Sequence, residues 1–150
     1  MENLFTINEV KLSYKTKQKA SERPKVLSSD SVHKLLLNCF DADTIEFREY
    51  FKVLLLNRAN QVLGVFNVSE GGISETIVDT RLILQSAILS NASGIIISHN
   101  HPSGNIKPSQ SDDNMTRKIK EACKIMNISL LDHVIITSES YYSYADEGRI

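Results

Sequence analysis

Residues 94–104 read GIIISHNHPSG, and the interpretation of the whole chain starts from this stretch. Residues 94–97 are short, rich in β-branched side chains and bounded by turn residues, which predicts a buried strand that leads into histidine. Side chains two positions apart on a strand point to the same face, so His99 and His101 can converge on one point at the end of the strand. Two converging imidazoles predict a metal site.

The residues that follow supply a third ligand. Residues 102–105 have turn chemistry, and a Pro-Ser pair before apolar residues at helical spacing predicts a helix that starts at Ser109. Neighbouring helix residues are about 100° apart, so only one of Asp112 and Asp113 can face the strand end, and we expect it to be Asp112. Two histidines, one carboxylate and an open position for water form the ligand set of a catalytic zinc site.

Each fragment also has a purely structural interpretation. A Ser-x-x-Asp sequence at a helix start, as at Ser109 and Asp112, is often only a capping box. The Asn-His-Pro-Ser-Gly sequence can equally be a loop with no ligand function. The metal-site hypothesis therefore depends on both fragments occurring together.

Taken together, the two fragments resemble a known motif. The pattern His-x-His, seven residues, Ser, two residues, Asp is similar, without departure, to the metal motif of the JAMM (MPN-plus) metalloprotease family. The form HNHPSG at residues 99–104, with LDH at 131–133 and YSY at 142–144, resembles the RadC branch. The resemblance implies a layered α/β/α domain of the cytidine-deaminase-like, JAB/MPN type over residues 28–148, and zinc-dependent hydrolysis of a peptide or isopeptide bond.

The family resemblance also implies a general base. Its members carry a Glu just ahead of the first core strand, followed closely by an aromatic residue and an apolar run. Glu49, in the sequence EYFKVL at residues 49–54, is the best match, and Glu46 is the second choice. A carboxylate near the metal can take the proton of the attacking water. The alternative for either residue is a solvated carboxylate at a strand entrance.

Four further residues are singled out by the same comparison. The Ser109 hydroxyl can cap the helix, or it can donate a hydrogen bond to the oxyanion, as its family counterpart does. The RadC branch carries Asp-His at the place of Asp132 and His133, and His133 can orient a metal ligand from behind or be an ordinary core histidine. Arg81 matches an Arg of the RadC pattern, although Thr80 stands where a Pro is expected.

The remaining pattern predicts strands mixed with three helices, hence an α/β layered domain. A helix capped at residues 28–30 carries an apolar stripe to Phe40, and a second helix is capped by Asp79-Thr80. Strands are predicted at residues 51–56, 62–68, 73–78, 94–97 and 133–136, with a helix over 109–126 and an edge strand at 141–144.

Composition limits the class of protein. A chain of 150 residues with 41% apolar residues makes one domain, and no apolar run approaches the length that spans a membrane. The N-terminus lacks the features of a signal peptide, which favours the cytoplasm. Two lone cysteines, Cys39 and Cys123, make neither a disulfide framework nor a Cys-x-x-Cys metal site, so we expect both to fill the core.

The charge is unevenly distributed. From Lys11 to Lys25 there are six basic residues against one acid, Glu22, although the net charge of the chain is only −1. We expect residues 1–27 to form a basic, partly extended segment ahead of a domain at 28–150. Such a segment can bind nucleic-acid phosphates, or it can simply be solvated. A DNA-repair module that binds DNA through this arm is the alternative function, although the helix-hairpin-helix portion usual in RadC proteins is absent here.

Two other metal-dependent classes are excluded by spacing. The letters His-Asn-His match HNH nucleases only by accident, since the three residues of that motif are spread over a longer ββα unit. Zinc deaminases need His-x-Glu and Pro-Cys-x-x-Cys, and neither occurs. The substrate and the oligomeric state have no signature in the sequence.

Overall fold

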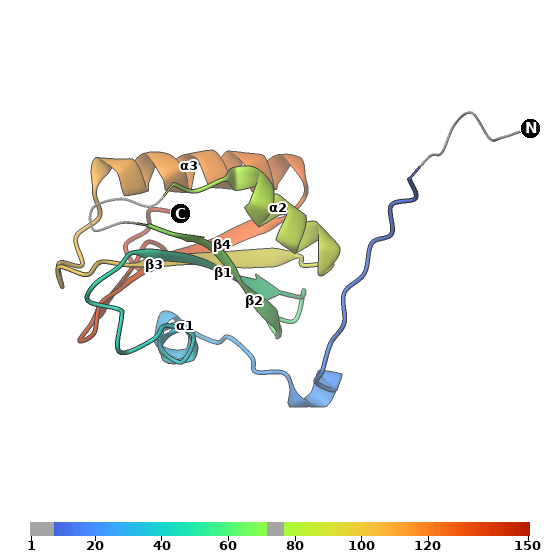
Figure 1. The fold of residues 1–150 in the computed structure, drawn as a ribbon, viewed down its shortest axis with the longest axis horizontal. Helices are drawn as coiled ribbons and strands as arrows, with labels where there is room; N and C mark the ends of the chain where they lie inside the picture. Colours follow the sequence, from blue (N-terminus) through green and yellow to red (C-terminus); the bar gives the residue numbers. More distant parts are fainter. Residues whose placement is uncertain (1–7, 72–76) are drawn as a thin grey trace, which may run out of the picture.

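The computed structural model describes residues 8–71 and 77–150, which form one five-stranded mixed sheet and three α-helices (Figure 1). Its elements are a 3-10 turn η1 at Ala20–Glu22, α1 at Ser29–Leu37, β1 at Tyr50–Leu56, β2 at Val62–Glu70, α2 at Thr80–Leu89, β3 at Gly94–Asn100, α3 at Gln110–Ile125, β4 at Ser129–Ile136 and β5 at Tyr141–Ser143. The strand order is β2-β1-β3-β4-β5. Among the strand pairs of residues 8–71 and 77–150, β3–β4 alone is parallel.

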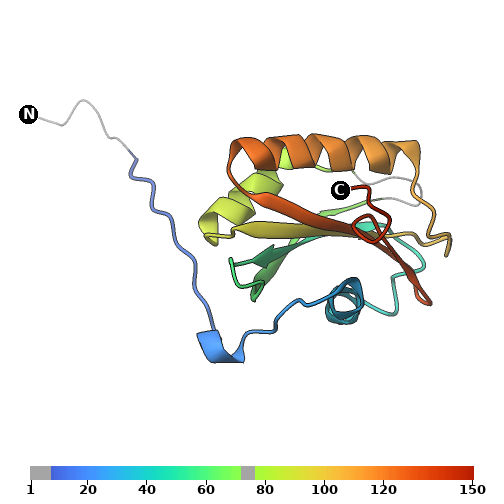
Figure 2. The same cartoon turned by 180° about the vertical axis from the view of Figure 1, so that it is seen from behind.

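The sheet lies between two helical layers, as Figures 1 and 2 show from opposite sides. Helices α2 and α3 cover one face and α1 covers the other. Alternate residues of β1 and β3 point to opposite faces, so each strand contributes to two apolar clusters. The α2/α3 face buries Phe51, Val53, Leu55, Ile83, Ala87, Ile95, Ile97, Ile119 and Cys123. The α1 face buries Val32, Leu36, Phe40, Leu54, Leu56, Ile96, Val134 and Ile136. The expected α/β/α layering is confirmed.

All three helix starts match their predicted caps, and at α1 the Ser28 side chain accepts from the Ser31 backbone N–H. The Asp79 side chain accepts from the Arg81 backbone N–H at the start of α2, and the Ser109 side chain accepts from the Asp112 N–H at the start of α3. Such caps satisfy backbone donors that the first helical turn leaves unpaired. At α3 the cap also sets which side chains of the first turn face the sheet.

Several helices and strands begin or end at other residues than predicted. Helix α1 ends at Leu37, before Phe40. Phe40 is nevertheless buried in the apolar cluster of the α1 face, and its N–H still donates to the Leu36 carbonyl at 3.2 Å. Cys39 therefore lies past the helix and is only partly buried, whereas Cys123 is fully buried as expected. Strand β4 begins at Ser129, earlier than predicted. The strand predicted at residues 73–78 falls mainly on residues 72–76, outside the described part of the chain.

From residue 8 to η1, the basic N-terminal segment is extended and exposed (Figure 1). Its last residues join the sheet edge, because the Val62 N–H donates to the Pro24 carbonyl at 2.8 Å and the Val26 N–H donates to the Asn60 carbonyl at 2.9 Å. In the described residues, no helix is long and apolar enough to cross a membrane. The boundary at residue 28 between arm and domain stays a prediction.

Candidate metal centre

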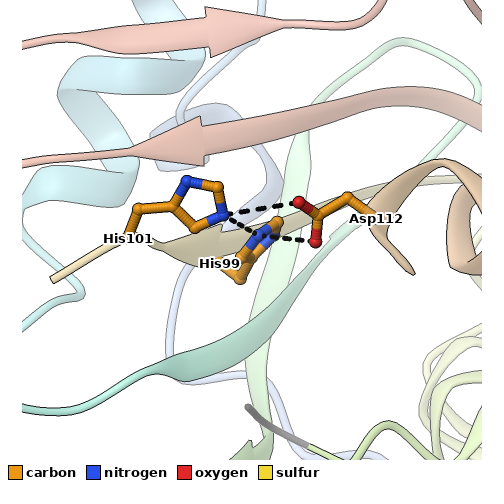
Figure 3. A group of neighbouring side chains, drawn as sticks. All are labelled: His99, His101 and Asp112. Atoms are coloured by element: carbon orange, nitrogen blue, oxygen red, sulfur yellow. Dashed lines mark hydrogen bonds and ion pairs between the residues drawn. The ribbon is translucent and has the colours of Figure 1, made fainter. Parts of the chain in front are cut away.

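The three predicted ligands meet at the end of strand β3 (Figure 3). His99 is the penultimate residue of β3, His101 follows the strand directly, and Asp112 lies in the first turn of α3. The His99 and His101 Nε2 atoms are 2.9 Å apart. Asp112 places Oδ1 at 3.1 Å from the His99 Nε2 and Oδ2 at 3.4 Å from the His101 Nε2. The structure therefore brings together the residues that the sequence selected as ligands.

Local folding explains this convergence. Strand β3 holds His99 on the α2/α3 face, in register with Phe51 of β1 and Ile135 of β4. The His101 N–H donates to the Ile136 carbonyl at 2.9 Å, so the chain continues along β4 for one more residue and keeps the alternation. Both imidazoles consequently point to the same side, where α3 begins.

The choice of Asp112 over Asp113 follows from the helix. Asp112 is 6% exposed and faces the histidines. Asp113 points away, and its Oδ1 accepts from the Tyr144 hydroxyl at 2.8 Å and from the Arg149 guanidinium at 2.8 Å. Adjacent helical residues thus perform separate tasks, one in the cluster and one in fastening the C-terminal tail to α3.

A buried chain of hydrogen bonds fixes the protonation of His99. The Thr116 hydroxyl donates to the Asp112 backbone carbonyl at 2.6 Å, so its single proton is used there. His133 Nδ1, at 2.6 Å from the same hydroxyl oxygen, must therefore be the donor in that contact. His133 Nε2 is left as an acceptor and receives the His99 Nδ1 proton at 2.8 Å. The His99 Nε2 lone pair is consequently directed at Asp112 and His101.

The tautomer of His101 is set by a single contact. Its Nδ1 atom lies 2.6 Å from the Asn105 backbone carbonyl, which can only accept, so Nδ1 carries a proton. When His101 is neutral, its Nε2 lone pair is free to bind a cation. Two Nε2 lone pairs 2.9 Å apart repel each other unless a proton or a metal ion lies between them.

The charges of the site are strongly coupled. Burial lowers the pKa of His101, but hydrogen bonds to Asp112 and to the Asn105 carbonyl, with the nearby charges of Asp112 and Glu49, outweigh it and raise that pKa. Burial raises the pKa of Asp112, yet the neighbouring imidazoles of His101 and His99 outweigh it and hold that pKa far below its usual range. Asp112 is therefore a carboxylate at neutral pH, as a metal ligand must be.

His133 behaves as a support for His99. Its side chain is fully buried, and burial followed by the neighbouring charge of His99 lowers its pKa well below the ordinary value, so the ring is neutral. The Tyr144 ring stacks on it at 4.8 Å with an interplanar angle of 8°. Groups that orient a metal-bound imidazole through its second nitrogen commonly set its tautomer. The structure thus places His133 where the orienting role requires it.

Asp132 has a different task from its neighbour. Its Oδ1 atom accepts from the His133 and Ala145 backbone N–H groups at 2.7 and 2.9 Å, and its Oδ2 accepts from the Ser143 hydroxyl at 2.6 Å. Burial raises its pKa. The carboxylate thereby holds the turn that delivers Tyr144 to the His133 ring.

Glu49, Glu46 and Ser109 differ in their burial and in their contacts. Glu49 directly precedes β1 and is half-buried, and its charge contributes to the raised pKa of His101. Glu46 is exposed, and its carboxylate accepts from the Ser138 hydroxyl at 2.7 Å. The Ser109 N–H and hydroxyl both donate to Asp112 Oδ2, at 2.7 and 2.8 Å, in a capping box. Ser109 therefore orients the carboxylate ligand in addition to capping α3.

Arg81, which the RadC pattern singles out, lies outside the cluster, in the first turn of α2 with an exposed side chain. His33 of α1 stacks on Tyr141 at 4.4 Å and is not part of the candidate ligand group found among the described residues. Sequence reasoning missed Thr116, although its position four residues after Asp112 puts it on the same face of α3. It also missed Asn100, which gave no periodic signal because it lies between the two histidines.

Among the described residues, His99, His101 and Asp112 form a group whose ligand atoms all lie within 4.8 Å of one another, so the cluster can hold a metal ion. The model of the RadC-like JAB domain family matches residues 24–149. The chain belongs to the RadC-like JAB domain family. The family match covers every residue of the cluster and both candidate carboxylates.

Relatives of this RadC-like chain occur in several bacteria. A UPF0758 protein of Flavobacterium johnsoniae is 49% identical over 100 residues, which are 67% of this chain and 44% of the relative. UPF0758 proteins of Porphyromonas gingivalis and Salinibacter ruber are 43% and 45% identical over 104 and 103 residues, in each case 69% of this chain and 46% and 44% of the relative. The aligned part of this chain therefore spans less than half of the length of these relatives.

Proposed function

We propose that this RadC-like JAB domain is a zinc-dependent hydrolase that cleaves a peptide or isopeptide bond. The observation that carries the proposal is the convergence of two histidine lone pairs and one carboxylate at the end of β3. A site with three such ligands and an open position is the arrangement of catalytic zinc centres.

The donor set fits zinc. A tetrahedral zinc ion with bonds of about 2.0–2.1 Å to nitrogen holds its ligand atoms about 3.3 Å apart. The two Nε2 atoms are 2.9 Å apart, His99 Nε2 lies 3.1 Å from Asp112 Oδ1, and His101 Nε2 lies 3.4 Å from Asp112 Oδ2, so each imidazole is close to one of the two carboxylate oxygens. Iron, manganese and cobalt accept similar ligands, so these metals can occupy the same site. When bound, zinc supplies a Lewis acid and lowers the pKa of the attacking water to about 7.

Glu49 is assigned as the general base. It would accept the proton of the water and return it to the leaving nitrogen, which is the usual task of a carboxylate within reach of the reacting water. Its charge reaches His101, whereas the Glu46 carboxylate is occupied by the Ser138 hydroxyl. These contacts favour Glu49 over Glu46.

Two alternative roles are proposed for the Ser109 hydroxyl. Its hydroxyl proton points to Asp112 Oδ2 at 2.8 Å, which supports a capping and orienting role. Donation to the oxyanion of the tetrahedral intermediate would require the hydroxyl to turn from Asp112 toward substrate. The two possibilities differ in their effect on stability and on turnover.

The test is hydrolysis by zinc-loaded protein of a panel of peptides and isopeptide-linked lysine conjugates. Glu49→Gln should lower turnover by at least about 10²-fold while zinc remains bound, because a general base contributes that much. Glu46→Gln is the matched control and should retain turnover. A zinc-loaded wild type that cleaves nothing in the panel would argue against the hydrolase, and equal loss in both variants would remove the assignment of Glu49.

A second candidate function rests on the basic arm. Lys11, Lys15, Lys17 and Lys19 are all exposed on an extended stretch of chain, where they can approach a phosphate backbone. Binding of DNA through this arm is compatible with hydrolysis at the metal centre. It would make the domain a DNA-associated enzyme or binding module.

A further inference from the structure

Asn100 lies between the two histidine ligands but faces the other side of the sheet. It is the last residue of β3 and is fully buried. Side chains alternate along a strand, so Asn100 points to the α1 face while His99 and His101 point to the α3 side. A polar side chain in that position needs partners for each of its hydrogen-bonding atoms.

Those partners lie in the segment that leads into β1 and at the first residue of β1. The Asn100 Oδ1 atom accepts from the Tyr50 N–H at 2.7 Å. Its Nδ2 atom donates to the Ile45 carbonyl and to the Arg48 carbonyl, both at 2.7 Å. One primary amide thereby binds backbone groups on both sides of Glu49.

These bonds replace the backbone pairing of the sheet at this point. The β1–β3 register begins with Phe51 opposite His99, so Tyr50 and Asn100 are the next facing residues. Residues 38–49 contain neither a helix nor a strand, and therefore have no regular ladder to hold them. Besides the Asn100 bonds, the Glu49 carbonyl accepts from the Gly71 N–H at 2.8 Å. The backbone of Glu49 is thus fastened to the metal-binding strand by a side chain of that strand.

At position 100, only a primary amide side chain provides one acceptor and two donors together. Asparagine supplies one acceptor and two donors, an aspartate supplies no donor when ionised, and serine has one proton. The two carbonyls of Ile45 and Arg48 would lose their shared donor in each substitution. A buried carbonyl without a partner favours local opening of the segment that carries it.

We propose that Asn100 is a positioning residue, which holds Glu49 at a fixed place relative to the cluster of His99, His101 and Asp112. The inference rests on the proposed function, in which Glu49 is the base. Asn100 does not support the ligands themselves, because the His99 ring is held by His133 and the His101 ring by the Asn105 carbonyl. Loss of Asn100 should therefore separate zinc binding from proton transfer.

The test compares Asn100→Ala with Asn57→Ala. Asn57 also forms three hydrogen bonds through its amide, accepting from the Ala59 and Gln61 N–H groups and donating to the Gln61 side chain. It lies just past the other end of β1, away from the metal cluster. If Asn100→Ala does not fold, Asn100→Ser keeps one hydroxyl and serves the same comparison.

Two readouts do not need a substrate. In Asn100→Ala, exchange of the Tyr50 amide proton should be at least about tenfold faster, because its acceptor is gone. In protein loaded with cobalt, the NMR signals of the Glu49 and Tyr50 amides should lose the paramagnetic shifts that they have in wild type. Zinc stoichiometry should be unchanged, and Asn57→Ala should leave both readouts at wild-type values. Unchanged cobalt-dependent shifts in Asn100→Ala would overturn the inference.

The kinetic readout tests whether Asn100 acts through Glu49. Asn100→Ala should lower kcat at least about tenfold with little change in KM, and it should cause no further loss when combined with Glu49→Gln. Full additivity of the two losses would contradict the positioning role. If wild type cleaves no substrate, the proposed function fails, while the cobalt experiment still decides whether Asn100 places Glu49.

Discussion

The Nδ1 atom of His99 lies 2.8 Å from the Nε2 atom of His133, and this contact joins the metal-binding strand β3 to its parallel neighbour β4. Because the neutral His133 ring donates its single N–H to the Thr116 hydroxyl oxygen, its Nε2 atom can only accept, and the proton of the contact belongs to His99. The tautomer of a candidate metal ligand is thereby set by residues outside the cluster.

Replacing His133 should therefore weaken metal binding without removing a ligand. We expect His133→Leu to lower zinc affinity by about 10–100-fold, the usual cost of losing a group that orients a metal ligand. Chelator competition measures this affinity. His33→Ala is the matched control, since His33 stacks on Tyr141 outside the cluster, and it should bind zinc like wild type. Equal affinity in His133→Leu and wild type would show that His99 needs no support.

Zinc affinity should depend on pH through His101. Its pKa is raised above the ordinary 6.5, so protons compete with zinc for Nε2 already above that pH. As pH falls through the His101 pKa, the affinity should decrease by about tenfold per pH unit for one displaced proton. Asp112 adds no competition, because its pKa is far below its usual range. Affinity that stays constant between about pH 7 and pH 5 would contradict this.

The raised pKa of His101 has the opposite effect on the stability of the metal-free protein. The raised pKa of His101 stabilises the fold in the protonated state, fully below pH 6.5, and this stabilisation is lost as pH rises through the raised value. Zinc-loaded protein should instead gain stability from acid toward neutral pH. Thermal melting with and without a chelator over this range measures both trends.

Ser109→Ala separates the two roles of this residue. Loss of the helix cap costs about 1 kcal/mol of stability, whereas loss of an oxyanion donor costs about 10²–10³ in rate. From its bonds to Asp112 we expect a lower melting temperature and weaker zinc binding. Unchanged melting with collapsed turnover would assign the oxyanion role instead, and lower melting with normal turnover would exclude it.

The basic arm makes a separate prediction. If it binds DNA, affinity should fall steeply with salt and should be reduced when Lys15, Lys17 and Lys19 are changed to Ala. Fluorescence anisotropy at two salt concentrations measures both effects. The three residues lie outside the metal cluster, so zinc content should be unchanged in the variant. Binding without salt dependence would end this hypothesis.

The elements nearest the metal site were the most predictable. A buried β-branched run, the His-x-His alternation and a helix cap are short-range patterns, and together they located His99, His101 and Asp112. The choice between Asp112 and Asp113 needed only the helical angle. These residues could be found because each ligand follows from the geometry of one strand or one helix.

The supporting residues could not be found in this way. The contact of His133 with His99 depends on the register between β3 and β4, and the stack of Tyr144 on His133 depends on a turn held by Asp132. Asn100 is defined by three backbone partners in an irregular segment about fifty positions away in the chain. Helix α1 was predicted too long because Phe40 keeps the apolar spacing after the helix has ended.

The metal content of purified protein tests the central claim most directly. Elemental analysis of wild type, after incubation with zinc and removal of excess ion, should give about one zinc per chain. His101→Ala and Asp112→Ala each remove one ligand and should lose the metal, whereas His33→Ala should retain it. Wild type that cannot be loaded with zinc would contradict the account, as would equal zinc content in the ligand variants.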